Sequence, residues 1–194
     1  MAWAAMPAPD YRQALLADVE AEADALIAEA RLDEALDLVQ GFRAAVQDDA
    51  RLTYEQGLIL RLMGDAEGAQ TLFEAAIEAD PTLAFAWYDL GELHLLASRT
   101  SEARAAFEQA SAMSAEHVNG WAAPFRLAEL AGIDGDVVAF DAQLKEALRR
   151  GFRFATVVDD PRWSRFLADE RLGEVLRRLM VVYGEERTLE AWDR

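Results

Sequence analysis

Side chains that could do metal or nucleophilic chemistry are few and widely spaced in this sequence. It contains two histidines, His94 and His117, and no cysteine. Transition-metal sites need His or Cys at short fixed spacings, such as H-E-x-x-H on one helix, and no such spacing occurs. None of the serines lies in a G-x-S-x-G turn, which presents a nucleophile above a sheet. We therefore expect no metal, no cofactor and no catalytic residue, and predict that the chain is not an enzyme.

Carboxylates are abundant, and some pairs are expected on any helix. Asp18 and Glu22 share one helix face, where like charges cost a few tenths of a kcal/mol each and are tolerated in solvent. The stretch "GIDGD" at 132–136 superficially resembles a cation-binding loop but lacks the later carboxylates of an EF-hand, so we interpret it as a turn. Asp160 precedes Pro161, which predicts a capped helix start.

The charge of the chain limits its partners. The net charge is −17, so a nucleic acid backbone or an anionic membrane would be repelled over most of the surface. The acids concentrate in residues 1–117, whereas the stretch from Lys145 to Arg178 holds nine bases against six acids. This asymmetry allows salt-sensitive self-association, with a chance difference between solvated helix faces as the alternative.

Length and composition indicate one well-cored globular domain, 1–194. Of its 194 residues, 53% are hydrophobic, but no apolar run approaches the roughly 18 residues of a membrane span. The first ten residues have no basic residue and no apolar run of signal-peptide length, so a cytoplasmic location is expected.

Residues of the same kind return every 34 positions. Gly57 and Gly91 are one such step apart, and so are Phe73 and Phe107. Further pairs with this spacing are Trp87 with Trp121, Ala69 with Ala103, and Ala76 with Ala110. Such a period is the signature of a stacked repeat.

Within each period the apolar spacing is helical. In residues 84–96, Trp87, Gly91 and His94 fall on one face, and His94 is interpreted as a packing residue rather than a ligand. A short polar break, "ASRTSE", precedes a second amphipathic segment over 102–113. Each unit therefore reads as a helix hairpin that must bury one face on its neighbours.

These residues resemble the tetratricopeptide repeat (TPR) family. The resemblance rests on W-Y-x-L-G-x-x-H from Trp87, on Ala103, Phe107 and Ala110, and on Asp80-Pro81. It implies an all-α, right-handed α-solenoid of about four TPR-like hairpins plus C-terminal capping helices. The expected repeats cover 16–49, 50–83, 84–117 and 118–152, followed by capping helices in 153–194.

The resemblance also implies a concave groove lined by the first helix of each hairpin. The candidate peptide-binding residues are Arg51, Tyr54, Leu58, Arg61, Phe85, Tyr88, Glu92, Leu95, Asn119 and Arg126. A TPR subclass that clamps a C-terminal carboxylate uses Lys and Asn at these positions. This chain has Tyr88 and Glu92 among them, so we expect a protein or peptide partner with basic and apolar side chains.

The function predicted is non-catalytic protein binding, as an adaptor or assembly factor. An accessory or regulatory subunit of an enzyme is the alternative, as is a dedicated chaperone similar to those of bacterial secretion systems. The sequence leaves open whether the groove is free or filled by the chain's own C-terminal tail.

Overall fold

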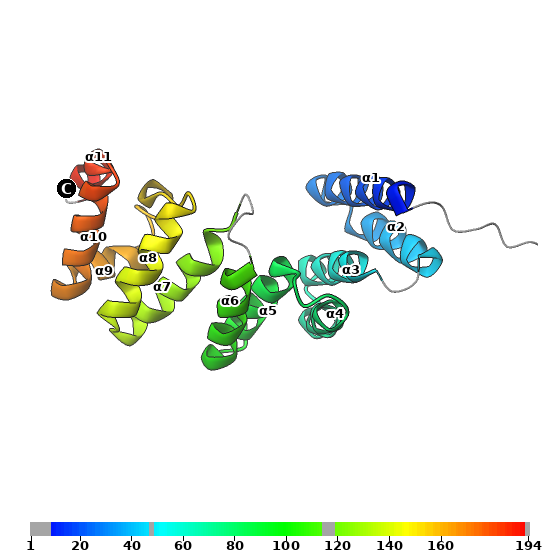
Figure 1. The fold of residues 1–194 in the computed structure, drawn as a ribbon, viewed down its shortest axis with the longest axis horizontal. Helices are drawn as coiled ribbons and strands as arrows, with labels where there is room; N and C mark the ends of the chain where they lie inside the picture. Colours follow the sequence, from blue (N-terminus) through cyan, green and yellow to red (C-terminus); the bar gives the residue numbers. More distant parts are fainter. Residues whose placement is uncertain (1–8, 47–48, 114–118, 193–194) are drawn as a thin grey trace, which may run out of the picture. The chain divides into compact units, whose positions relative to one another are not determined.

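The computed structural model describes residues 9–46, 49–113 and 119–192, and every regular element in these ranges is a helix (Figure 1). The all-α class expected from the sequence is thereby confirmed. Among these residues no helix is long and apolar enough to cross a membrane. The α-helices are α1 (Pro9–Ala28), α2 (Leu32–Ala45), α3 (Ala50–Met63), α4 (Ala66–Ala79), α5 (Ala84–Leu96), α6 (Thr100–Met113), α7 (Ala122–Asp134), α8 (Val137–Arg149), α9 (Pro161–Ala168), α10 (Glu170–Val182) and α11 (Glu186–Trp192).

The chain separates into two compact units, Met1–Leu93 and His94–Arg194. The first unit contains α1 to α4 and most of α5, and its first helix begins at Pro9, before the expected repeat start at residue 16. The second unit contains the helices from α6 onward. His117 lies outside the described residues.

Short polar caps define the hairpins of the first unit. Asp49 accepts hydrogen bonds from the backbone N–H groups of Arg51 and Leu52 and so starts α3. Gly64, at φ 90°, ends this helix in a left-handed conformation that glycine adopts without strain. Asp65 then caps α4 by accepting from the N–H of Gly68. The two helices can therefore reverse direction within a few residues.

Small residues let the paired helices of the first unit approach closely. A Cβ placed on Gly57 of α3 would lie only 2.8 Å from Cε1 of Phe73 on α4. Phe73 and its neighbour Ala69 are completely buried. The equivalent residues one period later, Phe107 and Ala103, are also completely buried within the second unit. The packing role predicted for the periodic residues is therefore confirmed.

Aromatic rings form the core of the second unit. Trp163 on α9 is fully buried and stacks on Phe125 of α7, with ring centroids 5.1 Å apart and planes at 14°. Phe166 of α9 meets Phe140 of α8 edge-on at 5.5 Å. Leu176 and Leu179 of α10 belong to the same core. The C-terminal helices thus cover the apolar face of the α7–α8 hairpin, as a capping segment should.

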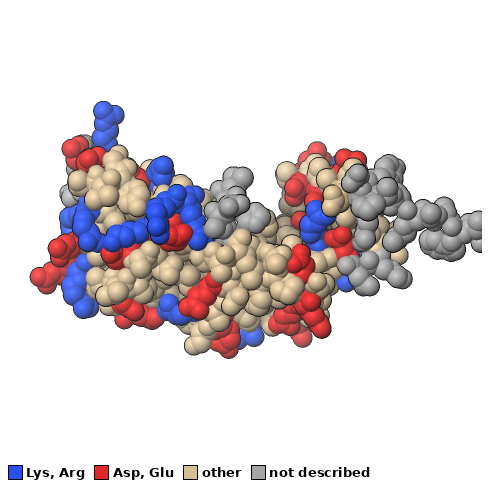
Figure 2. All heavy atoms as spheres, viewed as in Figure 1, with Lys and Arg blue, Asp and Glu red and all other residues tan. Residues whose placement is uncertain are grey.

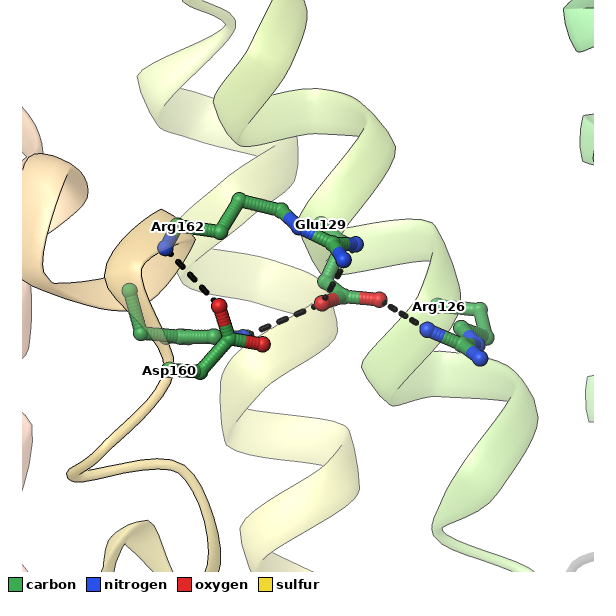
Figure 3. A network of polar contacts seen from close by, with 5 residues as sticks. Arg126, Glu129, Asp160 and Arg162 are labelled. Carbon is green, nitrogen blue, oxygen red and sulfur yellow. Dashed lines mark hydrogen bonds and ion pairs between the residues drawn. The ribbon is translucent and has the colours of Figure 1, made fainter.

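A buried carboxylate links α9 to α7. Glu129, only 4% exposed, accepts from Arg126 at 2.6 Å, from Arg162 at 3.2 Å and from Nε1 of Trp163 at 3.1 Å (Figure 3). Asp160 caps α9 by accepting from the backbone N–H of Arg162, which confirms the predicted cap. Two guanidinium groups and one indole therefore compensate a single buried charge.

We predict that Gly57→Ala destabilises the protein by about 1 to 3 kcal/mol, because the added methyl would overlap the ring of Phe73. The matched control is Gly41→Ala on α2, where an added Cβ meets nothing within 4 Å. That substitution should stabilise by about 0.5 to 1 kcal/mol, since alanine is the better helix former. Urea unfolding monitored by circular dichroism measures both. Equal effects would show that the close approach does not matter.

We also predict that Glu129→Ala costs about 1 to 3 kcal/mol, because it removes the acceptor of the buried indole N–H of Trp163, whereas water can reach the partly exposed side chains of Arg126 and Arg162. Trp163→Phe retains a ring but removes one donor, and should cost about 1 to 3 kcal/mol.

Arg104→Ala is the control for the Glu129 series, because it breaks the Arg104–Asp134 ion pair on the surface of the same unit. Its expected cost is about 0 to 1 kcal/mol. Unfolding curves in which Glu129→Ala is as mild as Arg104→Ala would contradict the central role of the buried carboxylate.

Candidate functional site

Four carboxylates from three helices of the first unit influence one another electrostatically. Glu20 and Asp24 lie on α1, Glu55 on α3 and Asp89 on α5, and we call them the acidic cluster. Among the described residues, no group of three or more His, Cys, Asp or Glu has the arrangement needed to hold a metal ion.

Two arginines and a tyrosine position the members of the acidic cluster. Arg51 lies 3.6 Å from Glu20, and Arg61 lies 3.5 Å from Asp89. The hydroxyl of Tyr54 donates to Asp89 at 2.8 Å. Burial, together with the nearby carboxylate of Asp89, raises the pKa of Tyr54, so this hydroxyl remains a donor at neutral pH.

Glu55 is the partly buried member of the cluster whose negative charge is least compensated by nearby donors or cations. Its Oε2 atom is buried and has no hydrogen-bond partner among the described residues. Burial first, and then the charges of Asp24, Glu20 and Asp89, raise the pKa of Glu55 to about 7. Burial likewise raises the pKa of Glu20 and of Asp89. A cation brought to this place would lower the energy of the ionised cluster.

Apolar surface lies beside the acidic cluster. Phe85 on α5 is 45% exposed, and the centroid of its ring is 6.5 Å from that of Tyr54. Tyr54 in turn contacts the buried ring of Phe73, with centroids 5.6 Å apart. The first unit therefore presents an exposed aromatic ring supported by two further rings, next to partly buried negative charge.

The other predicted groove residues occupy different environments. Leu58 is partly buried and packs against the core that contains Phe73 and Leu90. Tyr88 and Glu92 on α5 are half-buried. The charge of Glu92 contributes to raising the pKa of Asp89.

Three predicted groove residues, Leu95, Asn119 and Arg126, belong to the second unit. Leu95 is half-buried, and Asn119 is exposed. Arg126 forms an ion pair with the buried Glu129, whose other partners lie on the C-terminal helix α9. The candidate surface consists of first-unit residues only.

Sequence reasoning missed Glu55 and Asp89 as candidate residues. A positional signal was present, because Glu55 follows Arg51 by four residues and Asp89 follows Phe85 by four. Residues at this spacing share a helix face. The burial of both carboxylates was not visible in this pattern.

Comparison with known proteins supports the repeat assignment. The sequence model of the tetratricopeptide repeat family matches residues 60–123. No curated protein matches the chain.

Several solved structures share the fold. MamA 41-end from Desulfovibrio magneticus RS-1 has a TM-score of 0.63 at 15% identity, covering 88% of this chain and 94% of that one. YrrB, described as a TPR protein with an unusual peptide-binding site, has a TM-score of 0.60 at 16% identity, covering 89% of each chain. The TPR-like repeats of a putative kinesin light chain from Podosopora anserina have a TM-score of 0.58 at 16% identity, covering 92% and 93%. Residues 60–123 thus match the tetratricopeptide repeat family, and the chain shares the all-α solenoid fold of these structures.

Proposed function

We propose that this protein is a non-catalytic interaction module, an adaptor or assembly factor, that binds a peptide segment with basic and apolar side chains. The proposed binding surface consists of the acidic cluster with Tyr54 and Phe85. The observation that carries the proposal is the buried carboxylate oxygen of Glu55, which has no hydrogen-bond partner in the described part of the chain and lies within the field of three other carboxylates.

A lysine or arginine side chain would complement this surface in two ways. Its charge would offset the mutual repulsion of Glu55, Asp24 and Glu20. Its aliphatic stem, or an adjacent apolar residue, would cover the exposed ring of Phe85. Arg61 stays beside Asp89, so the surface is not uniformly negative, and a partner would need its cation at the Glu55 side.

The class of function is supported by the comparisons, since YrrB is described as having a peptide-binding site. An accessory enzyme subunit or a dedicated chaperone would use the same kind of surface and differ in the partner. The cytoplasmic location expected from the sequence stays a prediction.

We expect a fluorescently labelled peptide of alternating leucine and lysine to bind, and the same peptide with glutamate for lysine not to bind. Glu55→Gln should weaken binding of the lysine peptide roughly tenfold, equivalent to about 1.4 kcal/mol, because it removes the least compensated charge. Phe85→Ala should weaken it by a similar factor through lost apolar contact. Fluorescence anisotropy titration measures both dissociation constants.

Two exposed residues outside the proposed surface provide matched controls for the peptide titration. Glu78→Gln on α4 removes the same charge, and Leu96→Ala in the second unit removes exposed apolar surface. Both should leave the dissociation constant unchanged. If Glu55→Gln bound the lysine peptide as tightly as Glu78→Gln did, the proposed surface would be wrong.

The pKa of Glu55 also predicts a pH-dependent stability. Because this pKa is raised from 4.5 to about 7 on folding, the folded state holds the proton more tightly than the unfolded state. The stability that Glu55 contributes is present below its unfolded pKa and is lost as the pH rises from 4.5 to about 7. Glu55→Gln should therefore gain stability relative to the native protein as the pH increases through this range.

Urea unfolding at about pH 5 and about pH 8 measures the difference in stability between Glu55→Gln and the native protein, with Glu78→Gln as the control. Saturating lysine peptide should reduce the change of this stability difference with pH, because a bound cation lowers the pKa of Glu55. A stability difference that is the same at both pH values would refute the assigned burial of this carboxylate.

A further inference from the structure

The C-terminal half of α10 exposes apolar and basic side chains together. Val181 is 54% exposed and Val182 is 69% exposed. With Arg177, Arg178, Glu170 and Glu174 they line an open groove of about 570 Å³. The acids lie toward the start of the helix, and residues 177–182 contain two arginines and no acid.

The basic side chains belong to a wider positive region of the second unit. Lys and Arg gather over the C-terminal helices on the face shown in Figure 2. Arg178 reaches Asp141 of α8 at 2.6 Å, but its side chain is still 52% exposed. The surface that Arg177 and Arg178 form with Val181 and Val182 is called the α10 face below.

Helix α1 exposes acidic and small side chains, whereas α10 exposes basic and branched ones. Residues 13–28 of this helix contain four acids and no base. Its exposed residues include Ala14, Ala17, Asp18, Ala21, Glu22 and Ala25, which we call the α1 face. Alanine side chains allow another helix to approach closely, because the distance between packed helix axes depends on side-chain size.

We propose that the α10 face of one copy of this protein docks on the α1 face of a second copy. Val181 and Val182 would pack over Ala21 and Ala25, and Arg177 and Arg178 would lie beside Asp18 and Glu22. The two faces are complementary in charge, and the small side chains of one leave room for the branched side chains of the other. The contact is head-to-tail, so a pair of copies keeps one free α1 face and one free α10 face for further copies.

A second copy fits the α10 face better than an unrelated basic partner does. Arg177 and Arg178 would repel a basic partner, whereas the α1 face of a second copy is acidic. It also gives the exposed valines of the last long helix a cover that the chain itself can supply. Terminal helices of repeat arrays otherwise present polar outer faces.

Sedimentation velocity over a range of salt concentrations tests the proposal. At about 0.01 M salt, where the Debye length is about 30 Å, the protein should show a faster boundary that grows with concentration. At about 1 M salt, where that length is about 3 Å, the faster boundary should be lost. A monomer at low salt and high protein concentration would overturn the proposal.

Two variants test the faces separately. Asp18→Arg with Glu22→Arg reverses the charge of the α1 face, and Val181→Asn with Val182→Asn removes the apolar surface of the α10 face. All four residues are exposed, so circular dichroism should show both variants folded. Each variant alone should lose the faster boundary.

A mixture of the two variants distinguishes head-to-tail docking from general stickiness. The valine variant keeps an intact α1 face and the charge variant an intact α10 face, so an equimolar mixture should form a dimer and nothing larger. A mixture that stays monomeric, while the native protein associates, would contradict the proposed pairing of faces.

The charge control is Glu74→Arg with Glu78→Arg, two exposed residues with the same spacing on α4. Both charge variants make the strongly acidic chain less negative, which by itself reduces repulsion between copies. Association should therefore persist or increase in the α4 control and disappear in the α1 variant. Equal behaviour of the two variants would show that net charge, rather than the α1 face, controls association.

Discussion

Each helix hairpin of this protein has an apolar face that it cannot bury alone, and small residues set how closely its helices approach. Gly57 against Phe73 shows the constraint, because even a methyl group at this glycine would overlap the ring. The same solution recurs in the second unit, where a Cβ on Gly132 would lie 2.9 Å from Phe166. Close packing of this kind makes every helix position depend on its neighbours.

The C-terminal helices of the second unit do not repeat the hairpin pattern and instead cover the last hairpin. In the second unit, α9 places Trp163 over the apolar face of the α7–α8 hairpin, and Glu129 joins the two elements through hydrogen bonds. A buried carboxylate adds little net stability, but its donors have directional requirements that few alternative packings meet. The network therefore favours one arrangement of α9 on α7.

In the first unit, by contrast, several negative charges lie close together with few positive partners. Glu20, Asp24, Glu55 and Asp89 come from three helices, and only Arg51 and Arg61 form ion pairs with members of this cluster in the described structure. Burial of like charges works against stability in the absence of a ligand. Such an arrangement is expected where binding matters more than maximal stability, which is the physical basis for the proposal that the interaction surface lies on this unit.

The sequence by itself determined the helical hairpins and their packing residues. The 34-residue period identifies Ala69, Phe73 and their later equivalents, because side-chain size is a local property that the repeat preserves. The capping residue Asp160 could be predicted in the same way, since a helix start needs an acceptor next to its free N–H groups.

Only the tertiary structure showed which polar residues are buried or paired across helices. Arg126 was predicted to face a ligand, and the structure shows that it forms an ion pair with the buried Glu129, whose other partners are more than 30 residues away in the sequence. Glu55 became a candidate because α1 and α5 bring Glu20, Asp24 and Asp89 close enough to raise its pKa. Burial and the summed field of distant charges depend on contacts between helices, and a periodic pattern along one chain does not contain them.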